Sequence, residues 1–158
     1  MGESITDRCV TADRPGFRAR TTSVADTEAL AARLAANAQP GWVIGLQGDL
    51  GAGKTAFTRG FARGVGFSGR VHSPTFALLN EYLGGRWPLH HLDLYRLHSA
   101  EDVRGAGLEE YLLRPTGITL VEWSERWLEG QPAPAHWRQV SLQLISENER
   151  EMVGDWLP

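Results

Sequence analysis

The chain has 158 residues, a length that fits one compact domain, and the 42% hydrophobic and 22% charged residues are typical of a globular protein. Its net charge of -3 argues against a broad nucleic-acid-binding face, and no apolar run approaches the roughly 18 residues of a membrane span. Cys9 is the only cysteine, which excludes an internal disulfide and predicts a cytoplasmic location.

The first half of the chain predicts a strand, a helix, a second strand and a second helix. Residues 1–16 are expected to be a polar, disordered tail, and residues 17–22 predict a short strand. Ser23 begins a capping box before an alanine- and leucine-rich helix. Residues 42–47 form a nearly continuous apolar run, which is typical of a strand buried on both faces. The second helix is expected over residues 54–63.

The second half predicts more strands than helices. The expected elements are a hairpin of residues 76–82 and 87–92, a helix over 99–113 with weak points at Gly105 and Gly107, a buried strand at 118–121, and an antiparallel pair at 140–145 and 151–156. Strands that alternate with helices around a glycine-rich loop predict a three-layer α/β domain. The hairpins indicate that its central sheet is mixed, although mostly parallel.

The glycine-rich loop carries the strongest signal in the sequence. It matches the pattern G-x-x-x-x-G-K-[ST] in full: Gly48-Asp49-Leu50-Gly51-Ala52-Gly53-Lys54-Thr55. Backbone N–H groups of such a loop surround the phosphates of a nucleotide, Lys54 reaches the β- and γ-phosphates, and the Thr55 hydroxyl ligates Mg²⁺. Lys54 is also the only lysine of the chain. A P-loop fold that binds ATP or ADP with Mg²⁺ is therefore expected.

A second acid is expected to complete the metal site, and the sequence offers two. Glu122 ends the apolar run 118–121, and Asp93 ends the mixed run 89–92. Either carboxylate would lie at the carboxyl edge of the sheet, where ligands bind in α/β folds. A zinc site at His90 and His91 is disfavoured, because adjacent residues of a strand point to opposite faces.

Thr75 lies in Ser73-Pro74-Thr75-Phe76, a loop about twenty residues after Lys54. A threonine there can sense the γ-phosphate through Mg²⁺, although the same residues are ordinary turn formers. Guanine-specific GTPases carry an N-K-x-D element, which needs a lysine of its own. The single lysine of this chain already belongs to the glycine-rich loop, so guanine specificity is excluded. Adenine nucleotide is the better prediction.

The motifs together resemble the TsaE family, the bacterial ATPases of tRNA threonylcarbamoyladenosine biosynthesis. The resemblance covers about residues 17–123 and rests on the loop, on Ser73-Pro74-Thr75-Phe76, on His91-Leu92-Asp93-Leu94-Tyr95-Arg96-Leu97 and on Val121-Glu122-Trp123. It implies that residues 17–158 form a P-loop ATPase domain that is weak alone and stimulated by TsaB and TsaD, through which tRNA is reached indirectly.

The resemblance also implies roles for single residues. Thr55 and Glu122 would be the Mg²⁺ ligands, and Asp93 would lie near the γ-phosphate and assist hydrolysis. Thr75 would belong to a nucleotide-sensing loop, and Trp123 would lie near the nucleotide. Two other functions compete with this interpretation: a small-molecule kinase, and a binding module that senses ATP without hydrolysing it.

Overall fold

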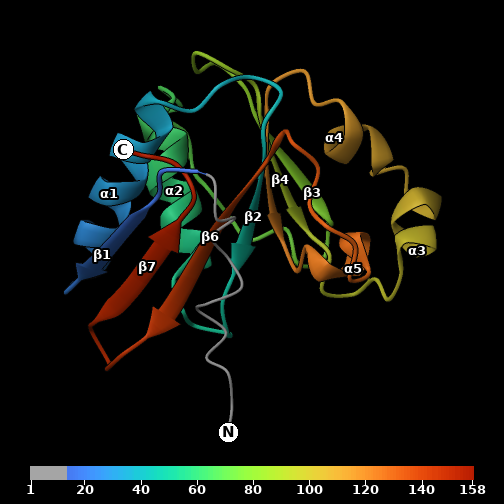
Figure 1. Cartoon of the computed structure of the whole chain (residues 1–158). Coiled ribbons are helices and arrows are strands. Elements are labelled where there is room, and N and C mark those ends of the chain that lie inside the picture. The colour runs from blue at the N-terminus through green and yellow to red at the C-terminus, as the bar shows by residue number, and fades with distance from the viewer. Residues whose placement is uncertain (1–13) are drawn as a thin grey trace, which may run out of the picture.

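The computed structural model describes residues 14–158, and most of the predicted tail, residues 1–13, lies outside the described part. The described chain forms one sheet of seven strands in the order β1-β7-β6-β2-β5-β4-β3 (Figure 1). The strands are β1 (Phe17–Thr21), β2 (Val43–Gln47), β3 (Leu79–Tyr82), β4 (Leu89–Asp93), β5 (Ile118–Glu122), β6 (Trp137–Leu144) and β7 (Arg150–Gly154).

The sheet is mixed, as the sequence predicts. Its four central strands, β6, β2, β5 and β4, are mutually parallel. The antiparallel strands lie at the edges, with β3 beside β4 and with β7 and β1 beyond β6. The carboxyl ends of the four central strands therefore meet at one edge of the sheet, which is where this architecture places ligands.

Helices cover both faces of the sheet and give the three layers that the sequence predicts (Figure 1). One face carries α1 (Val24–Ala36) and α2 (Lys54–Gly64), and the other carries α3 (Ala100–Gly105), α4 (Glu109–Leu113) and α5 (Glu125–Leu128). Each face has its own apolar core. Phe57 and Phe61 of α2 pack into the first, and Val103 and Leu112 pack into the second.

Local sequence signals account for most element boundaries. The Ser23 side chain accepts a hydrogen bond from the Asp26 amide and caps α1, as the capping box predicts. The helix expected over residues 99–113 is divided into α3 and α4, because Gly107 adopts a left-handed φ of 75°. The strand expected from residue 76 begins only at Leu79, because the preceding residues form a turn that Leu78 closes with a φ of 67°.

Candidate functional site

The glycine-rich loop connects β2 to α2 and depends on backbone conformations that favour glycine. Gly48, Gly51 and Gly53 have φ values of 153°, 81° and 106°. A side chain at Gly48 would also meet the Leu142 carbonyl oxygen of β6 at 2.5 Å. Leu50 is 91% exposed at the tip, so its side chain faces away from the enclosed part of the loop. The sequence forms this loop because glycines stand wherever the chain turns or approaches β6.

Lys54 is the first residue of α2, and its side chain folds back into the loop. The Nζ atom donates hydrogen bonds to the carbonyl oxygens of Gly48, at 2.5 Å, and Asp49, at 3.4 Å. The residue is only 7% exposed. The loop thus holds one ammonium group among its own carbonyl oxygens, a weakly compensated cation that an anionic ligand would attract. Thr55 follows in the first turn of α2 and is half-buried.

Both candidate acids lie at the carboxyl edge of the sheet and are direct neighbours. Asp93 of β4 pairs in register with Glu122 of β5, and Glu122 in turn pairs with Leu46 of β2. Both carboxylates are nearly buried, at 4% and 5% exposure. Since β2 leads directly into the glycine-rich loop, the sheet brings Asp93, Glu122 and the loop to the same edge.

Asp93 is fixed by hydrogen bonds to both of its carboxylate oxygens. The Thr75 hydroxyl donates to Oδ2 at 3.0 Å, and the Tyr95 amide donates to Oδ1 at 3.0 Å. The hydroxyls of Ser73 and Thr75 lie 2.8 Å apart, so the loop before β3 is attached to the same carboxylate. The loop residue Thr75 and the strand residue Asp93 are therefore one hydrogen-bonded unit.

Glu122 begins a second chain of hydrogen bonds, which sequence reasoning did not find. Its Oε1 atom lies 3.0 Å from Nε2 of the fully buried His91, and the Nδ1 atom of that ring lies 3.4 Å from the Tyr82 hydroxyl. The Tyr82 hydroxyl donates to the His72 carbonyl at 2.9 Å, and burial raises the pKa of Tyr82. Glu122 is thus connected to residue 72, three positions before Thr75. One sequence signal could have indicated this connection: residues 91 and 93 are two apart in a strand, so the His91 side chain lies on the same face as that of Asp93.

The two groups expected to bind magnesium, the Thr55 hydroxyl and the Glu122 carboxylate, are of the chemical type that suits a Mg²⁺ site. Magnesium prefers oxygen ligands and retains several waters, so a hydroxyl and a carboxylate suffice from the protein. His91 engages only Oε1 of Glu122, and Oε2 has no hydrogen-bond partner within residues 14–158. The same described residues contain no group of three His, Cys, Asp or Glu side chains that could hold a metal ion. His90 packs on Tyr111, away from His91, as the strand geometry predicts.

Trp123 lies directly beside the loop in a conformation that is uncommon for a large residue. Its φ is 59°, in the left-handed region, where a residue with a Cβ is strained by about 1–2 kcal/mol. Its ring packs against Tyr95, with centroids 5.1 Å apart, and Lys54 Nζ lies 5.4 Å from the ring centroid. The strained turn after Glu122 therefore places an aromatic face under the loop cation.

The C-terminal hairpin supplies one further contact that the sequence did not indicate. Arg150, the first residue of β7, donates from Nη2 to the Gly51 carbonyl at 3.4 Å, and its Nη1 donates to the Glu147 carbonyl at 3.1 Å. No motif marks Arg150, because its position depends on β6 and β7 returning to the loop (Figure 1).

Fold and loop together define an α/β domain of the P-loop type. Comparison with known proteins narrows this class. The model of the family described as "Threonylcarbamoyl adenosine biosynthesis protein TsaE" matches residues 21–152. The chain belongs to the TsaE family.

Individual relatives agree with this assignment. A tRNA threonylcarbamoyladenosine biosynthesis protein TsaE from Bacillus subtilis is 43% identical over 134 residues, which cover 84% of this chain and 81% of the relative. The protein of the same name from Treponema pallidum is 40% identical over 72% of this chain and 82% of its own length. The crystal structure of Bacillus subtilis YdiB superposes with a TM-score of 0.73 at 38% identity, covering 91% of this chain and 87% of YdiB.

Proposed function

We propose that this chain is a Mg²⁺-dependent ATP-binding subunit and P-loop ATPase that supports TsaB- and TsaD-type proteins in threonylcarbamoylation of the tRNA adenosine next to the anticodon. Membership of the TsaE family supports the pathway. The observation that carries the ATPase activity is the hydrogen-bonded pair of Thr75 and Asp93 at the sheet edge that also holds the loop.

The loop residues 49–55 bind the phosphates of ATP or ADP in this proposal. Lys54 exchanges its hydrogen bonds to the carbonyls of Gly48 and Asp49 for the phosphate oxygens, which are stronger, charged acceptors. Thr55 and Glu122 hold Mg²⁺, which neutralises charge on the phosphates when it is bound. Trp123 provides an apolar face beside the nucleotide.

Asp93 acts on the attacking water. Its carboxylate is held in place by Thr75 and the Tyr95 amide, so it is ready to orient a water molecule without first reorganising. Thr75 connects that carboxylate to its neighbour Phe76, which is 81% exposed and is where a partner can sense the nucleotide. A weak activity of the isolated chain and a higher one in the complex would follow if a partner that restrains this loop keeps Thr75 paired with Asp93 while the nucleotide is bound.

The partners carry most of the tRNA contact, since the chain is acidic overall. None of the helices in residues 14–158 is long and apolar enough to cross a membrane. The proposed setting of the complex is the cytoplasm, because a single cysteine favours a reducing compartment.

The test is ATP hydrolysis by the purified chain, alone and with the TsaB–TsaD pair of its own organism. We expect clear stimulation of hydrolysis by the pair. Lys54→Ala should lower both ATP affinity and turnover by at least about tenfold, because it removes one charged contact to the phosphates. Binding of ATP without stimulation would support a non-hydrolytic sensing module. Phosphate transfer to a small acceptor would support a kinase, and unchanged ATP affinity in Lys54→Ala would contradict the proposed site itself.

A further inference from the structure

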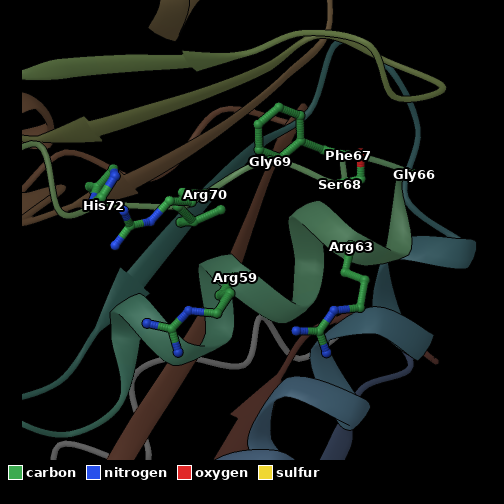
Figure 2. A pocket seen from close by; sticks show the side chains of 9 residues that line it. Arg59, Arg63, Gly66, Phe67, Ser68, Gly69, Arg70 and His72 are labelled. Carbon is green, nitrogen blue, oxygen red and sulfur yellow. The ribbon is translucent and has the colours of Figure 1, made fainter.

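A basic pocket lies beside the second half of α2, apart from the glycine-rich loop. It has a volume of about 740 Å³ and is formed by α2 and the segment of residues 66–72 that follows it (Figure 2). Arg59 and Arg63 project from the helix, while Arg70 and His72 project from the segment above (Figure 2). The pocket and the glycine-rich loop have no lining residue in common, although α2 connects them.

Three arginines line this pocket, and two of them pair with a single neighbouring carboxylate. Glu28 of α1 accepts from Arg59 Nη1 at 2.7 Å and from Arg63 Nη2 at 3.0 Å. Burial alone would raise the pKa of Glu28, but the bonds to the two arginines outweigh it and hold the pKa below its ordinary value. Glu28 is thus ionised at neutral pH and positions two of the arginines. Arg70 makes no hydrogen bond or ion pair within the described part of the chain, which leaves the pocket with an excess of positive charge.

The backbone on the opposite wall also offers hydrogen-bond donors. Gly66 has a left-handed φ of 92°, and its turn directs the chain away from α2. The amides of Ser68, Gly69 and Arg70 donate to no protein acceptor in residues 14–158. Backbone amides that remain unpaired beside arginines are the donor set by which proteins bind oxyanions.

We infer that this pocket binds a phosphate group, either in the backbone of an RNA strand or in a small phosphate compound. Guanidinium groups match the geometry of phosphate oxygens with paired hydrogen bonds, and the pocket lies within the roughly 300–1,000 Å³ range of ligand sites. The chain has a net charge of -3, so the remainder of its surface repels a polyanion. The local excess of arginines would therefore direct a polyanion to this pocket.

The pocket also communicates with the candidate site through His72. The Tyr82 hydroxyl donates to the His72 carbonyl at 2.9 Å and contacts His91, the partner of Glu122. A phosphate bound between Arg70 and α2 would therefore restrain a segment that leads, within three residues, to Thr75. The ligand would be placed to order the loop that carries the Thr75–Asp93 pair.

Arg70→Glu is the decisive variant, because it reverses a charge that supports no ion pair or hydrogen bond within residues 14–158. Arg114→Glu is its matched control: it makes the same change of charge at an exposed arginine after α4, on the other face of the sheet. All proteins compared should be full-length chains carrying Lys54→Ala, so that phosphate binding at the loop is weakened equally. Two probes separate the sources of phosphate: a labelled short single-stranded RNA followed by fluorescence anisotropy, and inorganic pyrophosphate followed by calorimetry.

We expect Arg70→Glu to weaken binding at least about tenfold and Arg114→Glu to change it less than about twofold. This difference with the RNA probe assigns the pocket to an RNA backbone, and the same difference with pyrophosphate alone assigns it to a small phosphate compound. Equal effects of the two variants, or no binding of either probe, would overturn the inference. Because Lys54→Ala is present throughout, the result does not depend on ATP hydrolysis.

Discussion

The backbone amide of Asp93 and both of its carboxylate oxygens take part in hydrogen bonds. In addition to the bonds to its carboxylate, its amide donates to the Leu78 carbonyl at 3.0 Å. A carboxylate held in this way has little freedom to adapt to a ligand. In the proposed mechanism, this carboxylate contributes the fixed position of its charge, which a neutral side chain of the same shape would lack.

Asp93→Asn should therefore separate turnover from binding. We expect ATP hydrolysis to fall by about 10²–10⁴, the usual contribution of a positioned acid or base, while ATP affinity changes less than about threefold. Steady-state hydrolysis and a direct nucleotide titration measure the two quantities. Asp102→Asn is a suitable control, because Asp102 is exposed and belongs to the cap of α3. Equal losses of affinity and turnover would assign Asp93 to nucleotide binding instead.

His90 contributes to the pH dependence of stability. It is 4% exposed, and its Nδ1 atom lies 3.3 Å from Glu81 Oε1, although neither ring nitrogen has a hydrogen-bond partner in residues 14–158. Burial lowers the pKa of His90 below 6.5, and the nearby carboxylates of Glu81 and Glu110 only partly oppose this effect. The unfolded chain therefore binds more protons at this residue than the folded chain does as the pH falls.

The free energy of unfolding should fall as the pH drops through 6.5 toward the lowered pKa of His90, by at most about 1.4 kcal/mol per pH unit. His90→Gln should remove this part of the slope, and His98→Gln, at an exposed histidine, should retain it. Denaturant titrations at a series of pH values measure the slope. An unchanged slope in His90→Gln would mean that other groups cause the acid sensitivity.

The helices α1 and α2 approach each other closely at two glycines. A Cβ atom at Gly60 would lie 2.2 Å from the Glu28 carbonyl oxygen, and one at Gly64 would lie 2.5 Å from the Ala32 carbonyl oxygen. These obstacles are backbone atoms, so a side-chain rotation cannot relieve them. The glycines, one helical turn apart, allow α2 to pack directly on α1.

Gly60→Ala tests this packing. Alanine favours a helix over glycine by up to about 1 kcal/mol, but separating two packed helices costs more. We expect a net loss of about 1–2 kcal/mol in the free energy of unfolding, measured by denaturant titration. Gly105→Ala in α3 is the control, because a Cβ there meets nothing within 4 Å, and it should leave the protein as stable or more stable. A stable Gly60→Ala variant would show that α1 shifts easily.

At the scale of elements, the sequence predicts those features that depend on local signals. The capping box, the apolar strand 43–47 and the glycine-rich loop were all predicted within a few residues. The short helix α5 was not predicted, because four residues are too few to establish a helical period. The connection from Glu122 to Tyr82 was not predicted either, because it joins three strands whose order the sequence does not state.

For the whole molecule, the position of β6 decides how the sheet is completed. The sequence predicts its pairing with β7, but the structure also inserts it beside β2, where Val43 pairs with Trp137. No local pattern encodes a contact between segments so far apart. The same insertion places Leu142 against Gly48, so the conformation of the loop depends on a strand that lacks candidate site residues.

A chain that ends after Trp123 would retain every site residue that the sequence predicts and lose α5, β6 and β7. We expect this truncation to lack a cooperative unfolding transition and to bind no ATP, since β2 loses one of its two neighbours and the buried residues Val140, Leu142 and Met152 leave the core. Thermal unfolding followed by circular dichroism and a nucleotide titration measure both effects. A truncated chain that unfolds cooperatively and binds ATP would contradict the structural role of β6.

The central position of β6 has a consequence for the growing chain on the ribosome. Synthesis proceeds at about 5–20 residues per second, so the stretch between Val43 and its partner Trp137 takes roughly 5–20 s to emerge. Both edges of β2 lack their partners until β5 is made, and one edge stays open until β6 follows. An apolar strand with an open edge is prone to pair with other chains. The open edge of β2 is therefore expected to stay exposed longer during translation than in a domain whose central strands are neighbours in sequence.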